Sequence, residues 1–306
     1  MDISNNFSEP FDYKALETLI KEIKERFPFA QVFSIGKSWD GRELFCIKLG
    51  SGKNSCLYVG AHHALEWCTS QILMRFVLDY CSKKENSESI MGYRVDQVFE
   101  KCTVYIIPML NPDGVELVIN GITENNPYYE RAIKINEGKT VFDDWQANIR
   151  GVDLNHNYYA GWGEGKMKER ELNIFFEGPT RYGGDYPESE KETVALCGFV
   201  RSVKPDSVIA FHSQGEEIYY EFKGKIPPKG EALAKIFSDF TGYQLIIPDG
   251  ITAVGGFKDW FIEEFEQPGF TIEAGFGKNP LSASQTEKAY SDLKKLLIAA
   301  PLFVGK

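Results

Sequence analysis

The sequence lacks any apolar run close to the roughly 18 residues that a membrane span needs. Its first six residues, Met1 to Asn6, also lack the positively charged region followed by an apolar segment that marks a secretory signal. Basic residues are in the minority, with 34 Lys and Arg against 44 Asp and Glu, so the net charge is −10. A nucleic-acid backbone needs a basic surface, which this composition does not supply. We therefore expect a cytoplasmic protein that binds neither nucleic acid nor a membrane.

Paired cysteines are also missing. The six cysteines, at positions 46, 56, 68, 81, 102 and 197, include no Cys-x-x-Cys pair, and most lie inside apolar runs. Cysteine in such a setting usually behaves as a small buried apolar residue. The sequence therefore predicts neither disulfides nor a metal site made of cysteines. Histidine is scarce as well, since the chain has only His62, His63, His156 and His212.

Strand and helix patterns alternate along most of the chain. Apolar runs predict buried strands at 56–59, 104–107, 207–211 and 270–273, and helical spacing predicts helices that include 12–27, 188–203 and 284–297. This alternation favours an α/β fold with a mostly parallel, mixed central sheet that has helices on both faces. Because 43% of the residues are hydrophobic and no low-complexity linker is present, we expect one domain over 11–306, preceded by a flexible tail at 1–10.

Three segments carry turn or loop signals. The runs at 32–35 and 44–47 flank the turn formers of 39–42 and predict a hairpin. Asn111-Pro112-Asp113-Gly114 is dense in turn formers, so a sharp bend is expected there. Residues 120–151 have a weak pattern, and a loop of that length inside one domain is usually functional.

His63 and Glu66 lie three residues apart, just after the apolar run Cys56 to Val59. Imidazole nitrogen and carboxylate oxygen are normal zinc donors, and a catalytic zinc site takes three protein ligands and leaves one position open. A His-x-x-Glu pair often arises by chance, so the pair alone is weak evidence. His212 closes a second buried-strand pattern and is the candidate third ligand. His63, His212 and Glu273 all follow strand runs, which places them at the carboxyl edge of a parallel sheet.

Several separated motifs resemble, in order, those of the zinc carboxypeptidase family, which has the carboxypeptidase A-like fold. The matching segments are Gly60 to Trp67, Asn111 to Gly114, Arg150 to Asn155, Phe211 to Ser213, Gly255 to Trp260 and Phe270 to Glu273. The resemblance covers nearly the whole chain and implies one zinc ion held by His63, Glu66 and His212.

The resemblance also implies roles for other residues. Glu273 is the general base, and Arg150 lies in the region where the family places a cation beside the scissile carbonyl. Asn155 and His156 fall in the segment that binds substrate. His62, next to a ligand in an extended chain, is expected to be structural.

Some positions depart from the family pattern. His156 stands where carboxypeptidases have the arginine that clamps a terminal carboxylate, and a neutral imidazole cannot form that bidentate contact. The family's usual arginine between the first two ligands is Leu65 here, and its tyrosine before Gly255 is absent from 249–254. Lys258 occupies the specificity position, where a lysine selects an acidic group.

The segments 211–217, 256–261 and 272–281 are similar to one bacterial branch of the family, the γ-D-glutamyl-L-diamino acid endopeptidases. This resemblance implies cleavage of the γ-D-glutamyl bond to meso-diaminopimelate or lysine in cell-wall peptides, with muropeptide recycling as the setting. Two alternatives remain. One is a zinc carboxypeptidase that removes C-terminal acidic residues, and the other is a non-catalytic peptide-binding protein with the same fold.

Overall fold

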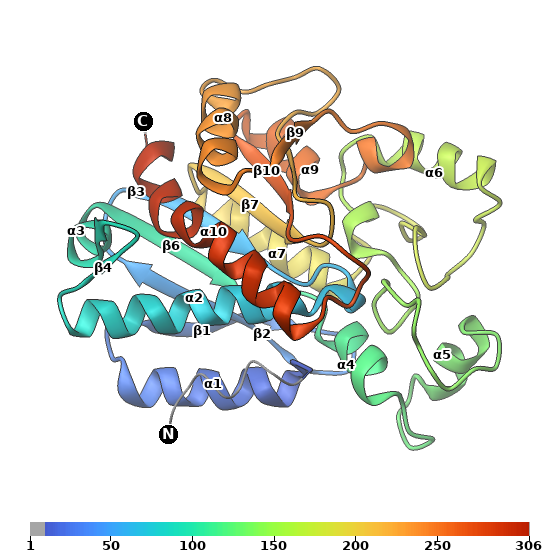
Figure 1. Ribbon diagram of the computed structural model, residues 1–306. Helices are drawn as coiled ribbons and strands as arrows, with labels where there is room; N and C mark the ends of the chain where they lie inside the picture. Colours follow the sequence, from blue (N-terminus) through green and yellow to red (C-terminus); the bar gives the residue numbers. More distant parts are fainter. Residues whose placement is uncertain (1–9, 306) are drawn as a thin grey trace.

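An eight-stranded mixed sheet runs through the molecule (Figure 1). In spatial order its strands are β1 (Gln31–Lys37), β2 (Glu43–Gly50), β6 (Cys102–Ile107), β3 (Asn54–Val59), β7 (Ser207–His212), β10 (Gly269–Glu273), β8 (Glu217–Tyr219) and β9 (Gln244–Ile246). The computed structural model describes residues 10–305. The tail predicted for 1–10 therefore lies, apart from Pro10, outside the described residues.

The four central strands β6, β3, β7 and β10 are parallel to one another. Nearly every residue in them is buried, as expected for strands covered on both faces. Strands β1 and β2 form the predicted antiparallel hairpin at one side of the sheet. The predicted α/β fold is confirmed, and the parallel strands end at a common edge.

Helices cover both faces of the sheet (Figure 1). On one face, side chains such as Tyr58 and Phe211 pack in one large apolar cluster with helices α1, α2, α3, α8 and α10. On the other face, Leu57 and Ala210 pack with α7 and α9. The two sets alternate along each strand because successive side chains point to opposite faces. The helix bounds are α1 Tyr13–Arg26, α2 Cys68–Glu85, α3 Val95–Lys101, α7 Lys191–Val203, α8 Gly230–Thr241, α9 Phe257–Phe265 and α10 Ala283–Val304.

The remaining elements lie around one end of the sheet and beside its helices. They are α4 (Pro112–Asn120), α5 (Tyr129–Ile135), α6 (Trp162–Glu171), the small hairpin β4 (Ser89–Ile90) with β5 (Tyr93–Arg94), and the 3-10 helices Ala64–Glu66, Leu154–His156 and Gly250–Ala253. Residues 120–151, expected to be an extended loop, contain α5 and a small apolar cluster that includes Phe142 and Trp145. This cluster gives the segment a core of its own.

The Asn-Pro-Asp-Gly segment begins a helix instead of forming an isolated turn. Asn111 caps α4 by accepting a hydrogen bond from the amide of Gly114, and Pro112 is the first helical residue. Both are favoured at those positions, because a cap needs a side-chain acceptor and the first turn needs no amide donor. The prediction of a sharp bend missed this helix, since the same residue types serve turns and helix starts.

All six cysteines are buried free thiols, as predicted. Between residues 10 and 305, no helix combines the length and the apolar character required to cross a membrane.

Asn111 generates a stability prediction. Its buried side chain accepts from Gly114 and donates to the carbonyls of His62 and Ala147. Asn111→Ala leaves these groups without partners, so the free energy of unfolding should fall by about 2–4 kcal/mol, which combines a lost cap with unsatisfied buried groups. Urea denaturation measures the change. The control is Asn120→Ala at the exposed end of α4, which should change the value by less than about 0.5 kcal/mol; equal losses in both variants would contradict the role of Asn111.

Candidate metal centre and active site

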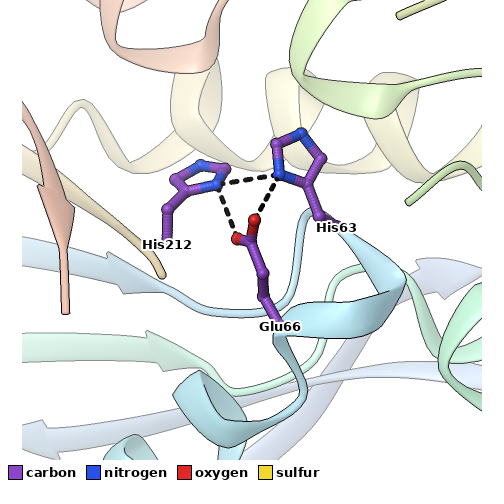
Figure 2. Close-up of side chains that lie close together, drawn as sticks. All are labelled: His63, Glu66 and His212. Carbon is purple, nitrogen blue, oxygen red and sulfur yellow. Dashed lines mark hydrogen bonds and ion pairs between the residues drawn. The ribbon is translucent and has the colours of Figure 1, made fainter. Parts of the chain in front are cut away.

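Three side chains from separate parts of the chain converge at the carboxyl edge of the sheet. His63 Nδ1 lies 2.8 Å from Glu66 Oε1, and His212 Nδ1 lies 2.9 Å from Glu66 Oε2. Figure 2 shows that the three side chains point toward one another. The two Nδ1 atoms are 3.3 Å apart. Two nitrogens and a carboxylate that face one point are the donor set of a catalytic zinc site with one position left open. Within the described part of the chain, these residues form the one group of this kind.

The backbone explains this convergence. His212 is the last residue of β7, and β3, which is parallel to β7, ends at Val59. The chain after β3 turns at Gly60, and His63 caps a short 3-10 helix that ends at Glu66. A Cβ at Gly60 would lie 2.7 Å from the carbonyl oxygen of Pro108, so this turn requires glycine.

Asp153 holds the first imidazole in place. Its Oδ1 lies 3.1 Å from His63 Nε2, the ring nitrogen that faces away from Glu66. A carboxylate on the far nitrogen of a histidine ligand fixes the tautomer and the ring orientation, as is common in zinc sites. Asp153 belongs to a motif matched at the sequence level, but no role was predicted for it. The signal was present, because an aspartate just before a predicted substrate-binding asparagine is a candidate orienting group.

The ionisable side chains of the site shift one another's pKa. Burial disfavours the charged form of Glu66, but His63 and His212 lower the pKa of its carboxyl to about 2. Burial likewise disfavours charge on His63, while Glu66 and Asp153 raise its pKa well above the usual range. Glu66 is therefore ionised at neutral pH, as a metal ligand must be.

A pocket of ≈ 120 Å³ opens beside His63. Its lining residues are Asn155, His156, Tyr219, Pro248, Gly256, Lys258, Asp259, Thr271 and Glu273. The pocket thus brings together His63 and four residues predicted for catalysis or substrate binding: Asn155, His156, Lys258 and Glu273. Tyr219, from β8, was not predicted, and its short strand carried no functional pattern.

Glu273 is the last residue of β10 and lies directly opposite His212 in the parallel register. Desolvation, together with the negative charge of Glu66, raises the pKa of Glu273 well above its usual range. A carboxylate with a raised pKa is a better proton acceptor near neutral pH.

Lys258 lies at the floor of the pocket, where its side chain is 6% exposed. Its ammonium contacts the carboxylate of Asp259 and the backbone carbonyl of Glu221. An ammonium has three donors, so one remains for a ligand. Lys258 was predicted to bind an acidic group of the substrate. The structure shows that the neighbouring Asp259 also serves as its counter-ion.

Arg150 contacts residues that do not line the pocket. Its guanidinium stacks over the ring of Trp39 at 4.2 Å and is 3.6 Å from Glu190. A role as oxyanion donor requires it to leave these contacts and stays a prediction. His62 is fully buried: its Nε2 lies 3.1 Å from the hydroxyl of Tyr158, and its ring stacks against that of His212.

Comparison with known proteins gives a consistent result. Residues 16–295 match the zinc carboxypeptidase family. The chain is 35% identical to γ-D-glutamyl-L-diamino acid endopeptidase 1 of Lysinibacillus sphaericus over 96% of its length and 73% of that protein. Bovine thrombin-activatable fibrinolysis inhibitor shares the fold, with a TM-score of 0.74 and 20% identity over 97% of this chain and 98% of that one. So does murein-tripeptide amidase from Escherichia coli O157, with a TM-score of 0.55 and 20% identity over 87% and 91% of the two chains.

The geometry predicts how metal content depends on His212. His212→Ala removes one of three donors, so the purified variant should contain much less than the one zinc per chain expected of the wild type. Because His212 ends its strand, the fold should persist in circular dichroism. Elemental analysis measures the metal. Full zinc in the variant would mean that the ligand set is wrong, while His156→Ala, which removes a pocket histidine outside the set, should retain the metal.

Proposed function

Since the chain belongs to the zinc carboxypeptidase family and is a zinc-dependent metallopeptidase, we propose that it hydrolyses the γ-D-glutamyl bond to meso-diaminopimelate, or to lysine, in cell-wall muropeptides. The observation that carries this proposal is the pocket itself, where a buried lysine forms the floor and His156 occupies the position of the usual arginine clamp. The relative from Lysinibacillus sphaericus, named for such an activity, supports it.

In this proposal His63, Glu66 and His212 hold the zinc ion. When bound there, zinc lowers the pKa of water and polarises a carbonyl group. Glu273 accepts the proton of the attacking water and returns it to the leaving amine. Asp153 keeps His63 in the tautomer that leaves Nδ1 free for the metal.

Substrate binding involves the other pocket residues. Asn155 Oδ1 accepts a hydrogen bond from the amide of Phe257, which leaves the NH₂ group of Asn155 for the substrate. Lys258 offers its remaining donor at the pocket floor, where we place the carboxylate that distinguishes diaminopimelate from lysine. His156, 3.9 Å from the carboxylate of Asp153, gives the pocket an imidazole in place of a guanidinium clamp.

We place this activity in the cytoplasm, as part of the recycling of muropeptide fragments. The six free thiols support this setting, because thiols persist in reducing compartments.

Incubation with L-Ala-γ-D-Glu-meso-diaminopimelate tests the substrate directly. Mass spectrometry should detect L-Ala-D-Glu and free diaminopimelate. The alternative, a carboxypeptidase for acidic residues, requires a free carboxylate at the C-terminus of an ordinary α-linked peptide. Cleavage of such a peptide, together with failure on the γ-linked one, would favour the alternative.

Glu273→Gln separates binding from chemistry. The amide keeps the shape of the side chain but cannot accept the proton, so turnover of the γ-D-glutamyl peptide should fall at least about a hundredfold, while zinc content and peptide binding persist. Steady-state kinetics and elemental analysis provide the readouts. Glu217→Gln removes a carboxylate from the residue opposite Glu273 in β8 and serves as the matched control, with activity expected within a few-fold of wild type. A Glu273 variant as active as this control would rule out the proposed base.

Lys258→Met tests the pocket floor. A charge-assisted hydrogen bond to a largely buried carboxylate contributes roughly 1.5–3 kcal/mol, so kcat/KM for the diaminopimelate peptide should fall about ten- to a hundred-and-fifty-fold. The lysine peptide, which lacks that carboxylate, should lose less.

The substitution leaves Asp259 buried without its counter-ion, so its effect on folding needs a separate control. The double variant Lys258→Met with Asp259→Asn removes both charges and should show the same change in selectivity. Unchanged kinetics on both peptides would show that Lys258 serves only its ion pair.

A further inference from the structure

The carboxylate of Asp153 connects the proposed zinc site to the backbone of Arg181. While Oδ1 of Asp153 faces His63 Nε2, Oδ2 accepts a hydrogen bond of 2.9 Å from the backbone amide of Arg181. His156 Nε2, in the pocket wall, is 3.9 Å from the same Oδ2. The carboxylate of Asp153 therefore contacts the main chain of Arg181 through one oxygen and the proposed ligand His63 through the other, next to the substrate pocket.

The segment around Arg181 is firmly anchored. The carbonyl of Pro179 accepts hydrogen bonds from the amides of Gln146 and Ala147, and the carbonyl of Tyr182 accepts one from the amide of Asp153. Arg181 itself has φ +66°, in the left-handed region that favours glycine.

Among the residues that the structure describes, the side chain of Arg181 has no partner. It is exposed, and no ion pair, hydrogen bond or ring contact engages its guanidinium within residues 10–305. Among the arginines in that range only Arg170, on α6, shares this property. Arg150 is held by Trp39 and Glu190. Of the two arginines without such contacts, Arg181 is the one whose backbone amide binds Asp153.

We propose that Arg181 is a specificity-determining residue that binds the free α-carboxylate of the γ-linked D-glutamate. A γ-linkage leaves this carboxylate as a branch near the scissile bond, and a planar guanidinium binds it through two parallel hydrogen bonds. Lys258 is buried and lines the pocket, whereas Arg181 is exposed on a backbone that is anchored to Asp153, so the two cations serve different substrate groups. This inference rests on the proposed function.

The test compares two peptides that differ at one group. One is L-Ala-γ-D-Glu-meso-diaminopimelate, and the other carries an amide in place of the D-glutamate α-carboxylate. In the wild type, kcat/KM should favour the acid over the amide. In Arg181→Gln this ratio should fall about three- to tenfold, a modest factor because an exposed ion pair is screened by water and salt. The ratio of the wild type should also fall as salt rises, and that of the variant should not.

Three further variants make the result specific. Arg170→Gln removes the same charge from α6 and should keep the wild-type ratio. Arg181→Gly suits the left-handed backbone, so its thermal unfolding should stay near that of the wild type, while its selectivity should drop as in Arg181→Gln. Lys278→Gln removes an exposed cation from the segment after Glu273 and should keep the ratio.

Each outcome bears on the inference. A wild-type ratio in both Arg181 variants, or a loss that appears in Lys278→Gln instead, overturns the role of Arg181 and leaves the proposed function intact. A wild-type enzyme that cleaves neither peptide overturns the proposed function and this inference with it. A loss confined to the two Arg181 variants supports the assignment.

Discussion

The parallel pairing of β10 with β7 is the constraint on which the site depends. Its register sets Glu273 directly opposite His212, and the parallel pairing of β7 with β3 brings the turn that carries His63 and Glu66 to the same edge. A slip of one residue in either pairing would turn the side chains to the opposite face. Because backbone hydrogen bonds between buried strands set this register, the central sheet positions the candidate metal-binding group and the proposed base.

The loops that complete the site are tied to this edge by buried polar contacts. Asp153 connects the segment after residue 150 to His63 and to the backbone of Arg181, while Asn111 connects the start of α4 to the carbonyls of His62 and Ala147. Burial makes the same contacts electrostatically important. Two carboxylates of one site are driven apart in pKa, since histidines lower that of Glu66 and desolvation raises that of Glu273. This separation allows one carboxylate to act as a ligand and the other as a base.

Features of the site that follow from neighbouring residues in the sequence could be predicted, and contacts between distant segments could not. His63, His212 and Glu273 each follow an apolar strand run, so the hydrophobic pattern was sufficient to predict that they lie at one edge of the sheet. The start of α4 at Asn111 was missed because proline, aspartate and glycine serve turns and helix starts alike. The contacts of Arg150 with Trp39 and Glu190 join segments more than 35 residues apart in the chain, and no pattern near Arg150 indicates them.

The sequence by itself determined the fold class and the family, because these follow from strand periodicity and from motifs that occur in the family's order along the chain. It also predicted the three side chains that meet at the candidate metal centre. Only the tertiary structure decided the electrostatic environment of the pocket. It showed that Lys258 has a counter-ion in Asp259, that Asp153 contacts the far nitrogen of His63, and that the guanidinium of Arg181 has no partner among the described residues. The physical reason is that charge and desolvation act through space, so the state of each ionisable group is set by its spatial neighbours, however distant they are in the sequence.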